Sequence, residues 1–197
     1  MQKKKVLVLL GHSDTETLTG EIANAYEEGA RAAGHEVRRI NIGELHFDPI
    51  LHKGYKVIQE LEPDLIRVQE TIQWCDHLVI LYPNWWSSMP ALLKGLFDRM
   101  WLPGFSFRYY KEGIGRRLHL WKRMMAKKTA RVIVTSGARP FFIWLFVGDY
   151  TNEIARGVLW FVGFDVEVTL LGPSENISPR KKSRWLLKMY RLGERAK

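Results

Sequence analysis

The sequence has little of several features that would narrow its function at once. It holds one cysteine, Cys75, which excludes an internal disulfide framework and a cysteine-rich metal site. Its longest uninterrupted apolar stretch is Phe141–Val147, far short of the ~20 residues of a membrane-spanning helix. An early apolar run, Val6–Leu10, has no small-residue cleavage site after it and is typical of a strand rather than a signal peptide. We therefore expect a cytoplasmic protein.

Residue patterns of two common enzyme classes are also missing. The six histidines form no H-x-x-x-H or similar pair, so we expect no metal site. No serine lies in a Gly-x-Ser-x-Gly elbow, which argues against a hydrolase of that kind.

The formal net charge of +9 is concentrated in two segments. The segment from Arg108 to Arg131 contains nine Lys and Arg residues and one acidic residue. The segment from Arg180 to Lys197 contains eight Lys and Arg residues and one acidic residue. Such segments could meet anionic lipid, cofactor phosphates or nucleic acid. No recognised nucleic-acid motif accompanies them, so we expect no nucleic-acid partner. The second segment is typical of an amphipathic surface helix, and the alternative is that it lies on an anionic membrane surface.

Short apolar runs alternate with helical patterns along the chain, which predicts one α/β domain over residues 1–197. The run Lys5–Leu10 is continuous, as in a strand that is buried on both faces. The expected sheet has five parallel strands, is doubly wound and carries helices on both faces. We expect strands at Lys5–Leu10, His35–Ile42, Leu78–Tyr82, Ala130–Thr135 and Phe164–Leu171, and connections at Gly43–Lys53 and Gly104–Gly115.

In such sheets a ligand binds beyond the carboxyl ends of the strands, where the strand order reverses. The loops after the first, third and fourth strands are therefore the candidate site. The first loop, Gly11–Thr19, is rich in hydroxyl groups and opens a helix, and helix N-termini bind anions. The alternative is that Thr17 or Thr19 only caps the helix. Asp14 and Glu16 count against a phosphate unless they point outward.

The second and third loops differ in character from the first. Paired tryptophans, Trp85 and Trp86, follow the third strand, and a flat aromatic ligand would cover them. The alternative is that they are core residues. The third loop, Thr135–Ala138, is built of small residues that let a planar ligand approach the backbone, although an ordinary strand-to-helix turn explains it as well.

The segment Tyr82-Pro-Asn-Trp-Trp-Ser-Ser-Met-Pro-Ala-Leu-Leu-Lys-Gly-Leu-Phe-Asp-Arg99 closely resembles the signature of the NAD(P)H:quinone oxidoreductase family of flavodoxin-like flavoproteins. That family includes quinone reductases, modulators of drug activity and ancillary subunits of potassium efflux systems. The similarity continues at Gly104–Tyr109 and Gly157–Phe164, and His12 stands where the family has a histidine. The resemblance covers nearly the whole chain, and its second-loop segment is the specific part.

The resemblance implies a flavodoxin-like fold and a homodimeric enzyme that passes a hydride from NADH or NADPH to flavin N5 and then to a quinone-like acceptor. The short chain favours FMN as the flavin, with FAD as the alternative. Phe107 and Tyr109 would wall the substrate pocket, from the same or the partner subunit. The implied cofactor-binding residues are His12, Glu16, Thr17, Leu18 and Thr19 in the first loop, Pro83, Asn84, Trp85, Trp86 and Ser87 in the second, and Thr135, Ser136, Gly137 and Ala138 in the third.

The chain departs from the family pattern at three places. The family usually has a Ser-x-Asn-like pattern where this chain has Thr17-Leu18-Thr19, and its third loop is usually richer in glycine. The stretch Arg139–Val147 lacks the tyrosine and histidine that help some members to handle the transferred charge. The acceptor and the proton donor are therefore left open. The alternative function is a flavin-binding regulatory subunit of a membrane transport system, and the basic charge disfavours a flavodoxin-type electron carrier.

Overall fold

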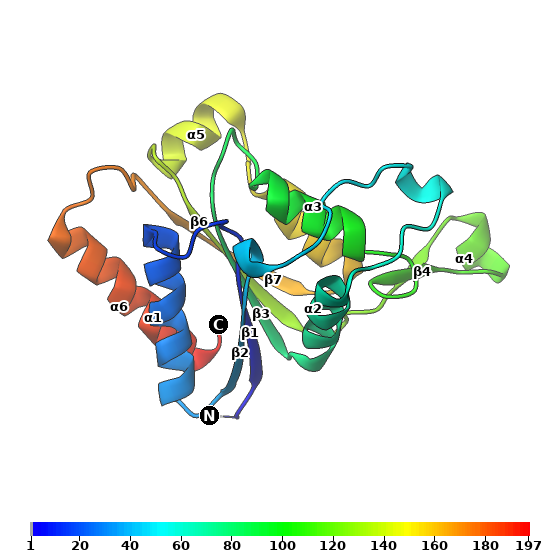
Figure 1. Ribbon diagram of the computed structural model, residues 1–197, viewed down its shortest axis with the longest axis horizontal. Coiled ribbons are helices and arrows are strands. Elements are labelled where there is room, and N and C mark those ends of the chain that lie inside the picture. The colour runs from blue at the N-terminus through cyan, green and yellow to red at the C-terminus, as the bar shows by residue number, and fades with distance from the viewer. Residues whose placement is uncertain (1) are drawn as a thin grey trace.

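A parallel sheet of five strands forms the middle of the molecule (Figure 1). The computed structural model describes residues 2–197, and Met1 lies outside the described residues. The strands lie in the order β2-β1-β3-β6-β7, so the sheet grows to one side of β1 and then to the other, as in a doubly wound sheet. The predicted architecture is confirmed. The strand bounds are Lys5–Leu10 (β1), Glu36–Asn41 (β2), His77–Pro83 (β3), Thr129–Thr135 (β6) and Asp165–Leu171 (β7).

Helices cover both faces of the sheet (Figure 1). On one face lie α1 (Leu18–Ala32) and α6 (Pro179–Arg195), which pack against each other. The other face carries α2 (Pro63–Trp74), α3 (Ala91–Met100) and the π-helix η3 (Glu153–Trp160). Two apolar cores result, one on each side of the sheet.

Strand β1 shows why these runs are apolar throughout. Val6, Val8 and Leu10 belong to the core beneath α1 and α6, whereas Leu7 and Leu9 belong to the core on the side of α2 and α3. Successive side chains of a strand point to opposite faces, so a strand between two helical layers needs an apolar residue at every position.

An arm projects from the body where the sequence analysis expected a connection at Gly104–Gly115 (Figure 1). Three-residue strands are too short to leave a periodic pattern in the sequence, which explains why they were not predicted. The arm consists of β4 (Phe107–Tyr109), α4 (Gly113–Arg117) and β5 (Trp121–Arg123), with β4 and β5 antiparallel.

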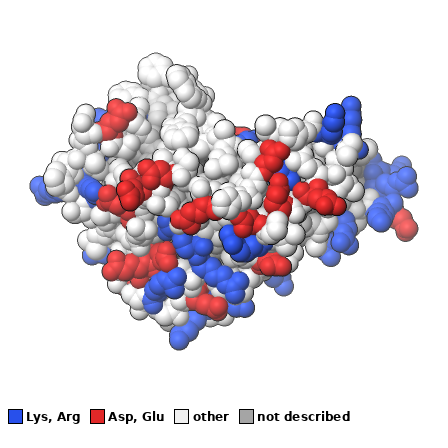
Figure 2. Space-filling model, viewed as in Figure 1, with Lys and Arg blue, Asp and Glu red and all other residues white. Residues whose placement is uncertain are grey.

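Aromatic packing anchors the arm to the body. The ring of Phe161 stacks on Trp121, with the ring centroids 4.4 Å apart, and meets the edge of the Phe107 ring at 5.2 Å. The first basic segment of the sequence lies largely on this arm, and Figure 2 shows Lys and Arg side chains gathered at that end of the molecule. The arm therefore presents positive charge away from the sheet.

Three further helical segments fall in or beside predicted connections. The short helices η1 (Ile42–Glu44) and η2 (Gly54–Lys56) lie around the expected loop Gly43–Lys53. Helix α5 (Pro140–Val147) begins with a proline, which is favoured in the first turn, and ends before Gly148, whose φ of 91° few other residues adopt. None of the α5 residues is buried.

No helix among residues 2–197 combines the length and the apolar character that crossing a membrane requires.

The basic C-terminal segment forms α6, and its apolar side chains point inward. Trp185 and Met189 are buried in the core shared with α1. Ser178 caps the helix by accepting from the Lys181 N–H, and Lys182 Nζ pairs with Glu21 Oε2 at 2.6 Å. This segment is thus an amphipathic helix whose apolar face is largely covered by the protein.

A buried polar cluster lies at the amino end of the sheet, opposite the candidate loops. His77 Nδ1 lies 2.7 Å from Thr129 Oγ1, and its Nε2 lies 3.1 Å from the Tyr26 hydroxyl. That hydroxyl donates to the Lys197 carbonyl. Burial, followed by the positive charge of Lys4, lowers the pKa of His77 to about 3. The imidazole is therefore neutral in the folded protein.

This cluster predicts a loss of stability in acid. Between about pH 6.5 and about pH 3 the unfolded His77 binds a proton that the folded one does not, so the free energy of unfolding falls as the pH falls. The contribution is at most about 1.4 kcal/mol per pH unit. We expect His77→Gln to show a shallower acid loss than the wild type in urea unfolding. Equal slopes in the two proteins would contradict the neutral imidazole.

Candidate functional site

The three predicted loops meet at the carboxyl end of the sheet. The Asn84 backbone N–H donates to the Thr135 carbonyl at 2.7 Å, which joins the second loop to the third. The Thr19 and Thr135 hydroxyls are hydrogen-bonded at 2.9 Å, which joins the first loop to the third. The His12 ring meets the edge of Trp85, with centroids 5.4 Å apart, and this contact joins the first loop to the second. These contacts thus connect every pair of loops.

An open hollow of about 460 Å³ lies between the second and third loops. Five of the predicted cofactor residues line it, and the remaining lining comes from α5 and from the loop after β7. The lining residues are Asn84, Trp86, Ser87, Gly137, Ala138, Phe142, Ile143, Phe146, Val147 and Glu175.

A strained turn carries Trp86 to the rim of the hollow. Trp85 and Ser88 exchange both backbone hydrogen bonds, each 3.1 Å long, around the two residues between them. Those two, Trp86 and Ser87, have φ angles of 52° and 61°, as in the hairpin turn that normally uses Asn-Gly. Non-glycine residues in this region cost about 1–3 kcal/mol each. The turn leaves the Trp86 side chain fully exposed, so the alternative of a core tryptophan does not apply to it.

An unpartnered polar atom lies beside the hollow. Asn84 Oδ1 is buried and accepts no hydrogen bond from any residue in the range 2–197. A buried acceptor without a donor costs about 1–3 kcal/mol, so the site is suited to a ligand that brings an N–H group. Gly137 and Ala138 line the same hollow, and their backbone N–H groups donate to no residue in the range 2–197.

The first loop lies apart from this hollow and is organised by its own backbone. Asp14 N–H donates to His12 Nδ1 at 2.9 Å, and Glu16 N–H donates to Asp14 Oδ1 at 2.8 Å. Thr17 is the N-cap of α1, because its hydroxyl accepts from the Gly20 N–H at 3.2 Å. The Thr17 side chain therefore caps the helix, as the alternative interpretation of the first loop predicts. The helix N-terminus remains an electropositive end beside the loop.

Two groups of predicted residues do not line the hollow. Pro83 ends β3, Trp85 lies against His12, and Thr135 and Ser136 are buried beneath the third loop. Phe107 and Tyr109 lie on the arm, where Phe107 packs on Phe161, and the structure does not bring them to the hollow within one chain.

Several residues at the site escaped the sequence analysis. Glu175 lies over Gly137, where a Cβ on the glycine would come within 2.8 Å of its carboxylate. Glu153 accepts from the Ser88 hydroxyl at 2.7 Å and ties the second loop to η3. Burial, followed by the charge of Glu153, raises the pKa of Tyr82 behind the loop, so the phenol stays protonated. Glu175 follows β7, whose loop the sequence did not single out, and Glu153 lies in η3, well beyond the third loop.

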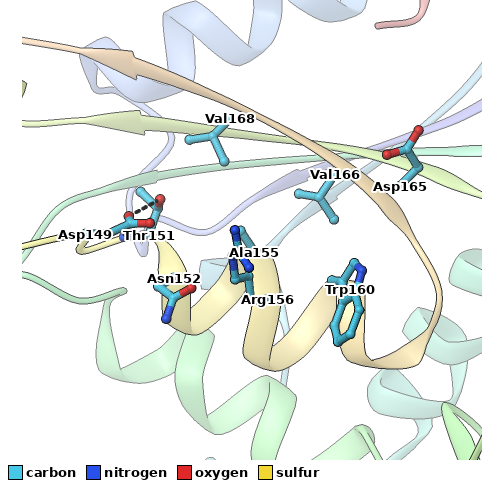
Figure 3. A pocket seen from close by; sticks show the side chains of 9 residues that line it. All are labelled: Asp149, Thr151, Asn152, Ala155, Arg156, Trp160, Asp165, Val166 and Val168. Atoms are coloured by element: carbon cyan, nitrogen blue, oxygen red, sulfur yellow. Dashed lines mark hydrogen bonds between the residues drawn. The ribbon is translucent and has the colours of Figure 1, made fainter.

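A second hollow of about 370 Å³ lies between η3 and the edge strand β7 (Figure 3). Val166 and Val168 of the strand face Ala155 and Trp160 of the helix across it, and Thr151 donates to Asp149 at 2.7 Å near one end. None of the predicted site residues lines this hollow. The candidate site is therefore the first hollow, which lies between the second and third loops at the strand ends.

The strand order and the two helical layers define a doubly wound α/β protein, and the candidate hollow lies at the carboxyl ends of its strands. The family model for the flavodoxin-like fold matches residues 4–187, and the chain belongs to that family.

Relatives with known structures or curated descriptions agree with this assignment. The chain is 24% identical to an uncharacterized NAD(P)H oxidoreductase of Escherichia coli, YcaK, over 87% of this chain and 85% of that protein. The structure of an NAD(P)H:quinone oxidoreductase from Methanothermobacter marburgensis is 24% identical, with a TM-score of 0.81 and full coverage of both chains. An FMN-dependent NADH-azoreductase of Bacillus anthracis, solved with FMN, is 18% identical, with a TM-score of 0.68 over 98% of this chain and 96% of that one. The resemblance drawn from the sequence is confirmed.

The packing of the first loop predicts an asymmetry between two glycines. A Cβ on Gly20 would overlap the Thr15 carbonyl oxygen, whereas a Cβ on Gly157 would meet nothing within 4 Å. We expect Gly20→Ala to lower the free energy of unfolding by about 2 kcal/mol or more, through displacement of the loop. Gly157→Ala is the control and should be neutral or stabilising by up to about 1 kcal/mol. Urea unfolding measures both, and equal values would contradict this account of the loop.

Proposed function

We propose that the protein is a flavin-dependent NAD(P)H oxidoreductase that reduces quinones or similar small acceptors. The observation that carries the proposal is the hollow at the carboxyl ends of β3 and β6, with an exposed indole at its rim and an unpartnered amide oxygen beside it. A flat aromatic ring with a polar edge satisfies both features at once. The names of the relatives, quinone oxidoreductase and azoreductase among them, support the same class of reaction.

The residues present fit a flavin. Trp86 offers a stacking surface, and Asn84 Oδ1 can accept from a ring N–H. A flavin supplies a position, N5, that accepts a hydride from a nicotinamide and donates it to a second substrate. The free N–H groups of Gly137 and Ala138 can stabilise negative charge at the ring edge, as backbone donors do in an oxyanion hole. These donors would serve where the family tyrosine and histidine are missing.

FMN is the flavin that we propose. The N-terminus of α1 would take its phosphate, with the Leu18 and Thr19 backbone N–H groups as donors. Asp14 and Glu16 are both exposed, and Asp14 Oδ1 is engaged with the Glu16 N–H, so neither carboxylate is buried at the helix N-terminus. The relative from Bacillus anthracis was solved with FMN.

We further propose that a second copy of the chain completes the substrate pocket. The hollow is open, and Phe107 and Tyr109 project on the arm away from the hollow of their own chain. A partner arm laid over the hollow would bring these rings to the acceptor. In the alternative function, the protein is a regulatory subunit of a transporter. It would bind flavin at the same site but would not turn over a substrate.

The exposed indole gives the first test of the site. Because Trp86 packs on no other part of the chain, Trp86→Ala should leave the free energy of unfolding unchanged and weaken FMN binding by about fivefold or more. Trp144→Ala is the matched control, since Trp144 is also an exposed tryptophan but does not line the hollow. Titration of apoprotein with FMN, followed by flavin fluorescence, measures both. Equal affinities would show that the indole does not stack on the ring.

Steady-state kinetics tests the reaction itself. The hollow has one open side, so we expect the nicotinamide to leave before the quinone enters. Initial rates with NADPH or NADH against a soluble benzoquinone should give parallel double-reciprocal lines. Intersecting lines would mean that both substrates bind together. Bound flavin without turnover would favour the regulatory subunit.

A further inference from the structure

Helix α5 is apolar at every position, yet the protein buries none of it. Its sequence is Pro-Phe-Phe-Ile-Trp-Leu-Phe-Val, from Pro140 to Val147. Helices that are apolar all round normally lie in a protein core or in lipid. Here the helix stands at the top of the molecule as drawn in Figure 1, and Figure 2 shows that this apex is almost free of charged side chains.

The helix has two apolar faces with different surroundings. Phe142, Ile143, Phe146 and Val147 line the hollow of the candidate site. Phe141, Trp144 and Leu145 recur at the spacing of one helix face, do not line the hollow, and are 63%, 57% and 55% exposed. The Phe141 and Trp144 rings lie 6.5 Å apart and form a continuous apolar surface. No other part of the described chain, residues 2–197, covers this outer face.

The size and composition of the outer face favour a bilayer over a second copy of the chain. Three side chains of this size and exposure offer roughly 300 Å² per copy, well below the ~800 Å² per partner of a standard protein interface. Phe, Trp and Leu are the residues with which surface helices enter the boundary between headgroups and acyl chains. Eight residues are too few to span a bilayer, so the helix can lie only at its surface.

Basic side chains flank the apolar apex. Arg139 is exposed and immediately precedes the helix. Lys181, in the first turn of α6, donates to the Gly172 and Pro173 carbonyls, and a Cβ on Gly172 would lie 2.9 Å from Pro140 Cδ. The start of α6 is thereby held near the start of α5. Cations beside an apolar insertion surface attract anionic headgroups.

We propose that α5 docks the protein on an anionic membrane surface, with Phe141, Trp144 and Leu145 entering the interface and Arg139 and Lys181 contacting headgroups. The basic C-terminal helix is not the inserting element, because its Trp185 and Met189 are buried against the protein. The other face of α5 is a wall of the hollow, so docking would bring the site close to lipid-dissolved acceptors. This last consequence rests on the proposed function, whereas the docking does not.

Vesicle flotation with the full-length protein tests the docking. Wild type should float with vesicles of equimolar phosphatidylcholine and phosphatidylglycerol, and less with phosphatidylcholine alone. Leu145→Glu should reduce the bound fraction by about tenfold or more, since it replaces an inserted apolar group by a charge. Leu187→Glu on α6 is the matched control, because Leu187 is 50% exposed against 55% for Leu145. It should bind as the wild type does.

Three outcomes would overturn the docking. The first is that the wild type floats with neither kind of vesicle. The second is that Leu145→Glu and Leu187→Glu bind vesicles equally. The third is that Leu145→Glu changes from dimer to monomer, as measured by light scattering, while the wild type does not bind vesicles. The last would assign α5 to a subunit interface. The FMN content of the same samples distinguishes a failure of the docking proposal from a failure of the flavin proposal. Loss of docking with retained FMN and turnover of a soluble quinone would leave the proposed function intact.

Discussion

The candidate site depends on the position of β3 between β1 and β6. Its register pairs Leu81 with Leu10 on one side and Pro83 with Thr135 on the other. The ladder continues one step beyond the strand, where the Asn84 N–H donates to the Thr135 carbonyl. Because the three strands end together, the three loops that follow them must share one edge of the sheet. A one-residue slip of β3 would exchange its two faces and remove the second loop from the third.

The two ends of the sheet differ in how well their polar groups are satisfied. At the amino end, His77 has partners on both ring nitrogens and the Tyr26 hydroxyl is hydrogen-bonded as well. At the carboxyl end, Asn84 Oδ1 has no partner in the described chain, and two consecutive residues, Trp86 and Ser87, hold strained conformations. Proteins retain such costs mainly where a ligand relieves them or where a function needs them. The unpartnered Asn84 oxygen and the strained turn together favour the carboxyl end as the candidate site.

The sequence predicted the parts of this arrangement that follow from regular periodicity. Continuous apolar runs located the central strands β1, β3 and β6, since burial on both faces leaves almost no polar position in them, whereas the edge strands β2 and β7 alternate with exposed residues. The adjacency of the three loops then followed from topology alone. The cap at Thr17 was left open, because a hydroxyl before a helix serves a cap and an anion site equally well.

The parts that were missed leave weaker or misleading signals. The strands of the arm have three residues each, and aromatic packing on Phe161 from a distant segment holds them in place. Glu175 reaches the site from the loop after β7, and Glu153 reaches it from η3. Both are far along the sequence from the second loop, and no local sequence pattern predicts contacts between segments so far apart. Their positions follow only from the three-dimensional fold.

Helix α5 shows how one segment can serve the site and the surface together. Its eight residues are apolar throughout, both on the side that lines the hollow and on the side that does not. Apolar residues on the inner face would favour a lipophilic ligand in the hollow, since every methylene buried there adds about 0.8 kcal/mol. Binding of a lipophilic ligand in the hollow does not require apolar residues on the outer face of α5. Charged residues on that face would have kept the helix soluble without changing the lining of the hollow. The presence of Phe141, Trp144 and Leu145 therefore needs a cause outside the pocket, and contact with lipid supplies one.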